Sequence, residues 1–415
     1  MTAEIYDMAR RARDAGRALG ALSGAVRAAA LREMAAALRA HTAEIQRANA
    51  ADLADAEAGG LSGPLVQRLR LSERTLCSMH DRLIAVAALP DPLGVISNGH
   101  VRPSGLRVMR VSVPLGVIGI IYESRPNVTT DAAAVCVKSG NAVILRGGSE
   151  ALRTNTLLAE LMAAAAAAAG VPADAVQTVR TPDRAAVGAL LQLDRFIDVI
   201  IPRGGQSLIA RIAAESRIPV IKHYDGICHQ YIAADADLEM AVAVVVNSKC
   251  EKVEVCNALE TLLVDAGAAE RVLPALAAAL RAQGVELRGD ARARAVVPMD
   301  AATEDDWSTE YLAPILAVRV VDGVEAAITH ITTYGSGHTD GIITGSMALA
   351  DRFVAGVDAA SVLVNASTRL SGGGDYGLGA VVGISTDKLH ARGPVGPDEL
   401  TCRKWVAYGA GHLRK

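Results

Sequence analysis

Cys256 is the residue of this sequence with the clearest capacity for chemistry. It stands in VNSKCEKVEVCNALETLLV, directly before an Asn-Ala pair and the apolar run 259–264. That run, interrupted only by Glu260 and Thr261, predicts a short buried strand. A thiol on the loop before a strand can be fixed in place and still be reached, and a thiolate attacks acyl carbons to form a thioester. The alternative is a small buried hydrophobic side chain, the commoner role of an intracellular cysteine.

Two glycine turns, each after a predicted strand, could hold a phosphate. Backbone amides at a strand-to-helix turn approach phosphates closely, although neither turn has the spacing G-x-G-x-x-G. For the turn that contains Gly204 and Gly205, the alternative is a tight turn that needs only a positive φ. Arg146 could pair with a ribose 2′-phosphate, which favours NADP over NAD, or it could lie on a solvated face. The residues of the two turns are Arg146, Gly147, Gly148, Arg203, Gly204 and Gly205.

Polar side chains follow three other predicted strands. Asn127, after YESRP, could donate its amide to a developing oxyanion or could begin a helix. The loop HITTYGSGHTDGIIT is dense in polar donors and could contact a substrate or be a solvated turn. The segment VNASTRL could hold a charged substrate or cap the next element. The candidates from these last two segments are His338, Thr339, Asn365, Ser367 and Arg369.

The composition excludes several classes of protein. With 415 residues, the chain predicts two or three domains. It is 51% hydrophobic and 21% charged with net charge −3, and aromatics are only 3%, which argues against nucleic-acid and membrane partners. The six cysteines form no C-x-x-C pair, and the spacing of Cys250 and Cys256 without nearby paired histidines argues against a zinc site. The N-terminus has no apolar signal core, so we expect a cytoplasmic protein. Because the cysteine spacing argues against zinc, we also expect no bound metal.

The elements that must position these residues change character along the chain. Residues 2–58 have helical apolar spacing, and glycines and a proline between 59 and 64 end it. From about 110 to 226 strands and helices alternate: the first predicted strand is RVSVPLGVIGIIYE, residues 110–123, and the last is IPVIKHYDG, residues 218–226. Such alternation predicts an α/β fold with a parallel sheet.

A second α/β block follows at residues 227–365 and contains the Cys256 region. The segments RPSGLRVMRVSV and TCRKWVAYG are predicted to be exposed strands with charges on one face. Exposed edges of this kind often pair with another subunit.

Read together, these segments resemble the aldehyde dehydrogenase superfamily, and most closely its glutamate-5-semialdehyde dehydrogenase family. The similarity covers nearly the whole chain. Its most specific pieces are VPLGVIGIIYESRPNVTTDAAAVCVKSGNAVILRGGSEA, KHYDGICHQYI, VCNALETLLV, DWSTEYLAPILAV, HITTYGSGHTDGIIT, VNASTRL and GISTDKLHARGPVGPDELT.

The resemblance implies roles for individual residues. Cys256 is similar to the catalytic cysteine, and Asn127 to the asparagine that shares oxyanion binding with the backbone N–H of that cysteine. Gly204 and Gly205 fall near the pyrophosphate-binding turn. Glu310 resembles the glutamate that contacts the nicotinamide ribose. Where the superfamily usually has a lysine near the adenosine ribose, this chain has arginine in the glycine turn LRGG.

Two departures from the superfamily affect the expected chemistry. Hydrolytic members carry a glutamate base in an ELGG-like segment, and the matching segment HYDGICH lacks it, although Asp225 is close. A reductase must protect its thioester from water until hydride arrives, so the missing base suits reduction. The second departure is EKVEV before the cysteine, in place of the Gln-Arg-Pro type of sequence of many relatives.

The fold implied by the resemblance is α/β and aldehyde dehydrogenase-like, with two parallel-sheet α/β domains and a small β oligomerisation hairpin. Its parts are a cofactor-binding domain (1–99 with 114–226 and 366–386), a catalytic domain (227–365) and an oligomerisation element (100–113 with 387–415). The implied reaction is NADPH-dependent reduction of L-glutamyl 5-phosphate to L-glutamate 5-semialdehyde and phosphate, the second step of proline synthesis. The implied partners are this substrate, further copies in a dimer or tetramer, and a separate glutamate 5-kinase.

Three other functions compete with this interpretation. A hydrolytic, NAD-linked aldehyde dehydrogenase would oxidise aldehydes without phosphate, and the missing glutamate argues against it. A cysteine acyltransferase would use no nicotinamide cofactor, and the two glycine turns argue against it. A scaffold protein would be indifferent to alkylation of Cys256, and the sequence shows no charged or aromatic surface for binding a partner.

Overall fold

The computed structural model describes residues 2–61 and 63–414, which form two compact units. Unit 1 comprises residues 1–222, 377–383 and 389–415, and unit 2 comprises residues 223–376 and 384–388. Residues 366–376, which the resemblance groups with the cofactor domain, make their contacts in unit 2. One reason is that Asn257 Nδ2 donates to the Arg369 carbonyl oxygen at 3.2 Å.

Unit 1 begins with the helices that the sequence predicts. The N-cap Ser23 accepts a hydrogen bond from the Val26 amide, and Ser72 does the same for Thr75, because free amides at a helix start need an acceptor. The third helix ends before the predicted glycine break. The helices are α1 (Thr2–Gly20), α2 (Gly24–Ala40), α3 (Thr42–Ala58), α4 (Gly63–Leu69) and α5 (Glu73–Ala88).

A four-stranded parallel sheet forms the centre of unit 1, in the order β5-β4-β3-β6. Side chains alternate between its faces: Val143 and Leu145 pack with α2, α5, α6 and α7, whereas Ala142 and Ile144 pack with α1, α8 and α9. Both faces are therefore covered, as a parallel sheet requires. The elements are β3 (Val117–Tyr122), α6 (Asn127–Lys138), β4 (Ala142–Arg146), η1 (Ser149–Ala151), α7 (Leu152–Ala168), η2 (Ala173–Ala175), β5 (Val176–Thr178), α8 (Ala185–Leu190), β6 (Val199–Arg203) and α9 (Gln206–Glu215).

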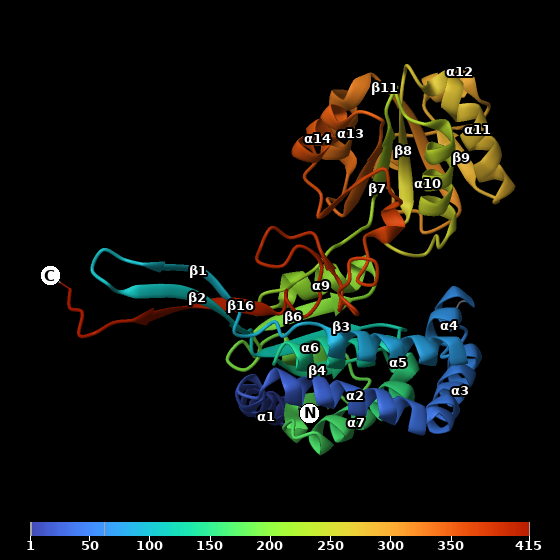
Figure 1. The fold of residues 1–415 in the computed structure, drawn as a ribbon. Helices are drawn as coiled ribbons and strands as arrows, with labels where there is room; N and C mark the ends of the chain where they lie inside the picture. The colour runs from blue at the N-terminus through green and yellow to red at the C-terminus, as the bar shows by residue number, and fades with distance from the viewer. Residues whose placement is uncertain (1, 62, 415) are drawn as a thin grey trace. The chain divides into compact units, whose positions relative to one another are not determined.

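A three-stranded antiparallel sheet extends from unit 1 as an arm that includes the C-terminal strand (Figure 1). Its strands are β1 (Ile96–Val101), β2 (Arg107–Pro114) and β16 (Thr401–Tyr408). The prediction of one strand over 110–123 was wrong, because β2 belongs to the arm and β3 to the parallel sheet. Gly116, with φ +132°, turns the chain between them, and this conformation excludes most other residues.

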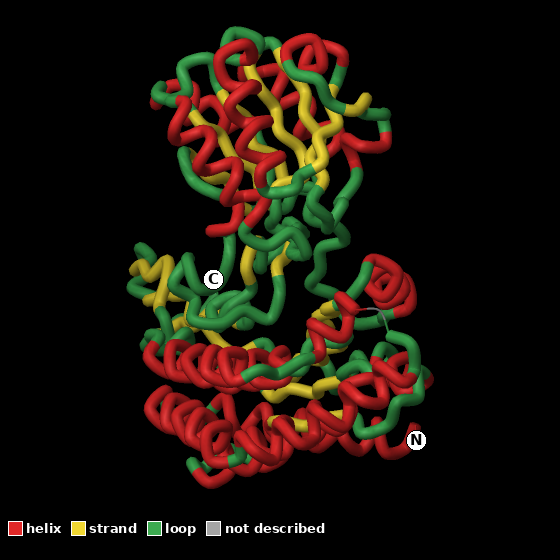
Figure 2. The backbone as a smooth tube through the Cα atoms, turned by 90° about the vertical axis from the view of Figure 1, so that its right-hand side faces the viewer, coloured by secondary structure: helices red, strands yellow, loops and turns green. Residues whose placement is uncertain are grey.

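Unit 2 contains a seven-stranded parallel sheet in the order β10-β9-β11-β8-β7-β12-β13. Helices cover both of its faces: α10, α11 and α12 on one, α13 and α14 on the other (Figures 1 and 2). The elements are β7 (Cys228–Ile232), α10 (Leu238–Cys250), β8 (Leu259–Asp265), α11 (Ala269–Ala282), β9 (Glu286–Gly289), α12 (Ala291–Val296), β10 (Asp300–Ala301), η3 (Asp305–Ser308), β11 (Ile315–Val321), α13 (Gly323–Tyr334), β12 (Thr339–Ile343), α14 (Met347–Gly356), β13 (Ser361–Val364), η4 (Thr368–Leu370), β14 (Ile384–Ser385) and, back in unit 1, β15 (Gly393–Pro394).

The predicted strand over 218–226 is not formed. Val220 alone makes a parallel bridge, to Ile200, and the chain then leaves unit 1 after residue 222. The apolar residues of the segment fit a strand, but only the first few have a neighbouring strand to pair with. Among residues 2–61 and 63–414, no helix combines the length and hydropathy needed to cross a membrane.

Candidate active site

Cys256 lies on the turn between α10 and β8, and its side chain is partly exposed. Cys228 Sγ donates to the Cys256 carbonyl oxygen at 3.2 Å, which ties the turn to β7. Gly226 passes so close to this carbonyl that a Cβ built on it would lie 1.8 Å from the oxygen. Only glycine fits there, so the segment HYDGICH and the cysteine turn are packed backbone to backbone. Cys256 is therefore fixed on a rigid support without the residue being fully buried.

Two histidines converge on the thiol, and we call Cys256, His223 and His338 the thiol cluster. One ligand-type atom from each residue lies within 4.8 Å of the other two. His223 Nδ1 donates to the Ile384 carbonyl oxygen at 2.9 Å, which orients its ring. His338 is fully buried, and its Nδ1 lies 2.9 Å from Thr339 Oγ1. The sequence did not predict this arrangement.

The histidines change the acidity of the thiol. Burial alone would raise the pKa of Cys256, but the positive charge of His338 and the contact with His223 hold that pKa well below its usual value. The thiolate is the nucleophilic form of cysteine. A perturbed thiol in contact with imidazoles is typical of a catalytic cysteine.

Glu310 also reaches this region. Its Oε1 accepts a hydrogen bond from the Gly226 amide at 2.9 Å. Burial, with a contribution from the negative Cys256, raises the pKa of this carboxyl. The structure thus brings Glu310, for which the resemblance implies a cofactor contact, to the segment that packs on the cysteine turn.

The predicted substrate residues lie in different settings. Asn365 has φ +54° and its amide holds the Thr344 backbone, donating to its oxygen and accepting from its nitrogen at 2.9 Å each. Ser367 Oγ accepts from the Arg369 amide at 3.3 Å and caps η4. Thr339 is buried, and its Oγ1 lies 2.9 Å from Ser371 Oγ.

Among the predicted substrate residues, Arg369 contacts the residue that follows the nucleophile in the chain. Its guanidinium hydrogen-bonds the side chain of Asn257, the residue after Cys256. Its Nε also donates to Glu251 Oε2 at 2.8 Å, and the side chain is 19% exposed. A partly exposed guanidinium at this point could take a carboxylate oxygen in place of Glu251.

The remaining predicted residues lie in unit 1. Asn127 is the first residue of α6, and its amide donates to Asp131 Oδ2 at 3.2 Å. Gly147 and Gly148 follow β4, and Gly147 packs against the side chain of Asn155. At Asn127 the expected alternative, a helix start, describes the local geometry. Gly148 has φ −61°, and neither Gly147 nor Gly148 is among the glycines with a positive φ, so this turn does not depend on that conformation. A ligand contact is compatible with both sites.

The glycine turns have properties that fit a dinucleotide cofactor. Gly205 caps α9, and its amide donates to Glu123 Oε2 at 2.8 Å, so the turn already holds an anionic oxygen. A Cβ on Gly204 would lie 2.6 Å from Glu123 Oε2, so a larger residue there would require the Glu123 side chain to move away from the turn. Arg146 donates to the Pro182 carbonyl at 2.9 Å, while its buried Nε has no partner. Burial lowers the pKa of Arg146.

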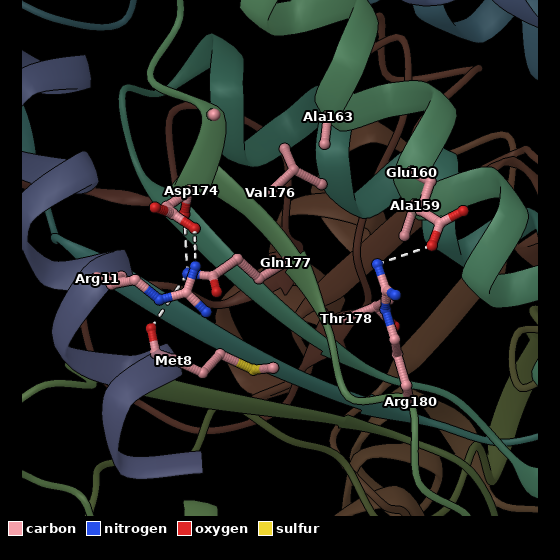
Figure 3. Close-up of a pocket in the computed structure, with 11 residues that line it drawn as sticks. Met8, Arg11, Ala159, Glu160, Ala163, Asp174, Val176, Gln177, Thr178 and Arg180 are labelled. Carbon is pink, nitrogen blue, oxygen red and sulfur yellow. Dashed lines mark hydrogen bonds and ion pairs between the residues drawn. The ribbon is translucent and has the colours of Figure 1, made fainter. Parts of the chain in front are cut away.

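A separate hollow of about 300 Å³ lies between α1, α7 and β5 and contains none of the predicted residues. Figure 3 shows its charged groups paired with one another, Arg11 with Asp174 and Arg180 with Glu160. Since its charges are already neutralised, we assign it no ligand.

Comparison with known proteins shows what the chain is similar to. The model of the aldehyde dehydrogenase family matches residues 1–299. A gamma-glutamyl phosphate reductase of Caulobacter vibrioides is 56% identical over 409 residues, covering 98% of this chain and 99% of that protein. One of Caulobacter sp. is 55% identical over 416 residues, covering 100% and 99%. The crystal structure of a gamma-glutamyl phosphate reductase of Thermotoga maritima superposes with TM-score 0.95 at 41% identity, covering 99% of this chain and 100% of that one.

Sequence reasoning missed His223 and gave His338 a different role. His223 lies in HYDGICH, the segment in which hydrolytic relatives carry their glutamate base, and that position was the available signal. The distance along the chain, 33 residues from His223 to Cys256 and 82 from Cys256 to His338, hides the contact from any local pattern.

Proposed function

We propose that this chain, which belongs to the aldehyde dehydrogenase family, reduces L-glutamyl 5-phosphate to L-glutamate 5-semialdehyde and phosphate. The observation that carries the proposal is the thiol cluster, in which two imidazoles lie beside Cys256 and lower the pKa of its thiol. The names of the relatives, which are more than 50% identical over nearly their whole length, supply the substrate.

The proposed first step is attack of the Cys256 thiolate on the acyl carbon of the substrate. A carbon–sulfur bond forms, the carbon–oxygen bond to phosphate breaks, and phosphate leaves with the bonding electron pair. The product is a thioester on Cys256. An acyl phosphate needs no strong acid to depart, so the role of the histidines is to keep the sulfur ionised. Addition of a hydride to the thioester carbon and of a proton to its oxygen would then give a thiohemiacetal on Cys256. When its carbon–sulfur bond breaks, the aldehyde forms and the same thiolate is released.

His223 supports reduction rather than hydrolysis of that thioester. One ring nitrogen donates to the Ile384 carbonyl and the ring also hydrogen-bonds the thiol, so the imidazole is oriented toward sulfur. A base for hydrolysis must instead be oriented toward a water molecule. The carboxyl of Glu310 accepts from the Gly226 amide, and its raised pKa reflects burial rather than contact with solvent. The thioester is thereby protected until hydride arrives.

A nicotinamide cofactor supplies the hydride, as the chemistry of the family requires. We propose that it is NADPH, held by Gly204 and Gly205 at the start of α9 and by Arg146 at the end of β4. The anionic oxygen already bound at the Gly205 amide supports the first assignment, and the unpartnered Nε of Arg146 supports the second. The other residues proposed for this role are Gly147, Gly148, Arg203 and Glu310.

Arg369 is the residue that we propose for the carboxylate of the substrate. It contacts Asn257 beside the nucleophile, and its ion pair with the exposed Glu251 is one that a substrate carboxylate could replace. Arg369→Gln should therefore raise KM for the substrate more than it lowers kcat. The roles proposed for His338, Thr339, Asn365 and Ser367 are to shape this same region of unit 2.

Two further assignments come from the family resemblance. Asn127 and the backbone N–H of Cys256 are proposed as donors to the oxyanion, and a donor of this kind contributes roughly 3–4 kcal/mol to transition-state stabilisation. The arm formed by β1, β2 and β16 is proposed to pair with another copy in a dimer or tetramer. It exposes Trp405 and Tyr408, each more than half accessible, which supports that assignment.

The proposed setting is the reducing cytoplasm, because all six cysteines are free thiols. The acyl phosphate substrate is unstable in water. Direct transfer from an associated glutamate 5-kinase would shorten its exposure, and we propose that association for this reason.

The function is tested most simply in the reverse direction. Glutamate 5-semialdehyde and NADP are supplied, and the absorbance of NADPH is followed with and without inorganic phosphate. Phosphate-dependent formation of NADPH is the expected result. Equal rates without phosphate would mean that water accepts the acyl group, and the chain would be a hydrolytic dehydrogenase.

A further inference from the structure

We propose that the thiol cluster is also a binding site for a divalent transition-metal ion, Zn²⁺ above all, and that its occupancy switches the enzyme off. The site would consist of Cys256 Sγ and one ring nitrogen from each of His223 and His338, which lie within 4.8 Å of one another. The inference rests on the proposed function only for its inhibitory consequence, because metal binding itself needs no substrate.

Both rings are oriented as metal-binding histidines are. A ligating imidazole usually binds the metal through one nitrogen, while the other holds a backbone carbonyl or a polar side chain. His223 Nδ1 donates to the Ile384 carbonyl oxygen at 2.9 Å. His338 Nδ1 lies 2.9 Å from Thr339 Oγ1, which in turn lies 2.9 Å from Ser371 Oγ. These contacts fix the Nδ1 sides of both rings and leave Nε2 as the ligand atom.

His338 Nε2 provides an independent indication that a ligand is missing. The side chain is fully buried, and this nitrogen has no hydrogen-bond partner. A buried polar atom without a partner costs about 1–3 kcal/mol, so a structure seldom retains one without a reason. A bound metal ion would give this nitrogen a partner.

The ligand types favour Zn²⁺. Thiolate and imidazole are its preferred ligands, with Zn–S and Zn–N bonds of about 2.3 and 2.0–2.1 Å. In a tetrahedral site these bonds place ligand atoms about 3.3–3.6 Å apart. Side-chain movements of about 1 Å would bring the cluster to that spacing. Three protein ligands leave the fourth position for water, and the nearby carboxyl of Glu310 would offset the remaining positive charge.

The metal would block the reaction directly. A sulfur atom bound to Zn²⁺ shares its negative charge with the metal, which makes it a much weaker nucleophile, and the metal with its water also blocks the approach of the acyl carbon. Binding releases protons in either case: the proton of a neutral thiol, or, where the thiolate faces a protonated imidazole, the proton of that imidazole, because a ligating histidine must be neutral. The same residues that activate the nucleophile would therefore make it sensitive to free Zn²⁺, and a chelator would reverse the inhibition.

The experiment titrates the full-length protein with Co²⁺, a spectroscopic substitute for Zn²⁺, in the absence of substrate and cofactor. We expect one Co²⁺ per chain and a thiolate-to-cobalt absorption band in the near ultraviolet. Zn²⁺ should displace the Co²⁺, and EDTA should remove the band. In the phosphate-dependent assay, one equivalent of Zn²⁺ should abolish turnover, and EDTA should restore it.

Variants identify the ligands. Cys256→Ser should lose the band, and His223→Gln and His338→Gln should each weaken Co²⁺ binding by at least about tenfold, since even residues that only support a ligand cost this much. The matched control is Cys250→Ser, a partly buried thiol of the same unit outside the cluster, which should bind as the natural protein does.

Three results would overturn the inference: a band that survives Cys256→Ser, unchanged affinity in both histidine variants, or full turnover with Zn²⁺ bound. If a histidine variant fails to fold, protection of Cys256 against iodoacetamide by Zn²⁺ in the natural protein replaces it, and lack of protection contradicts the site. A chain that binds Co²⁺ as expected but shows no phosphate-dependent reaction would keep the metal site and lose the proposed function.

Discussion

The Lys249–Glu260 ion pair and the thiol cluster lie at the same turn of unit 2, and they differ in how their charges are neutralised. Lys249 Nζ donates to Glu260 Oε2 at 2.6 Å, and both side chains are fully buried. The other carboxylate oxygen of Glu260 accepts from the Leu312 amide at 3.3 Å. Each charge of the pair thus has a fixed partner inside the protein, and no position is left for a ligand.

In the thiol cluster, by contrast, at least one hydrogen-bonding position is not filled by a protein group. Cys256 is partly exposed, and His338 retains a buried nitrogen without a partner. Closed polar pairs fix the backbone, and here the pair holds Leu312, which has φ +51°, two residues after Glu310. Open clusters keep their charges available to a reactant. Of these neighbouring charged groups, the Lys249–Glu260 pair therefore has a structural role, and the thiol cluster has a chemical one.

Removal of the nucleophile should have the largest effect. Cys256→Ser should lower kcat by at least about 10⁴-fold, because the hydroxyl of serine remains protonated beside the histidines. The urea midpoint should stay close to that of the natural protein, since the side chain is partly exposed. Steady-state kinetics and urea unfolding measure the two quantities. A fully active serine variant would remove Cys256 from the mechanism.

Removal of one charge of the closed pair should act on stability instead. Lys249→Met leaves the buried Glu260 without its partner and should lower the free energy of unfolding by about 3–5 kcal/mol. The double variant Lys249→Met/Glu260→Leu should recover most of this loss. Urea unfolding of both variants is the measurement.

An exposed ion pair serves as the control for that experiment. Arg352 and Glu325 pair on the surface, each about half accessible, so Arg352→Met should leave the urea midpoint almost unchanged. Equal losses for the buried and the exposed pair would contradict the structural role of Lys249.

A glycine substitution tests the support of the thiol cluster. Gly226→Ala places a Cβ 1.8 Å from the Cys256 carbonyl oxygen, so the turn must shift, and kcat should fall by about 100-fold. Gly374→Ala, in the same unit, meets no atom within 4 Å and should leave kcat unchanged. If both variants were equally active, the close packing of HYDGICH on the cysteine turn would have no role in catalysis.

Much of the fold follows from local sequence. Helical spacing over 2–58 predicts α1 to α3, because a helix buries one stripe of apolar side chains. The apolar run after Cys256 predicts β8, because that strand is buried along almost its whole length. Pairing was harder to predict. A β-branched run such as 110–123 fits one strand or two, and the choice between them depends on partners elsewhere in the chain. The segment 218–226 has strand composition but almost no neighbour to pair with.

The candidate site was predictable in part. Cys256 stands out by its position before a buried strand, and Arg369 by its charge after another. His223 and His338 could not be placed beside the thiol, because the contact depends on how β7 and β12 lie next to each other in the sheet. His338 directly precedes β12, and Cys228, whose sulfur contacts the cysteine turn, begins β7. If the pairing of these two strands had been known, His338 could have been placed near Cys256.

The central claim is that the two histidines keep Cys256 ionised, and the rate of its alkylation as a function of pH tests this most directly. The reaction is run with iodoacetamide in the presence of EDTA and quantified by mass spectrometry of the Cys256 peptide. Because the folded pKa is lowered, the rate should reach its plateau at a lower pH than that of an ordinary cysteine and should fall as the pH is lowered further. In His338→Gln the midpoint should move upward. A rate that rises through about pH 8.5, as for an ordinary cysteine, in both proteins would contradict the account.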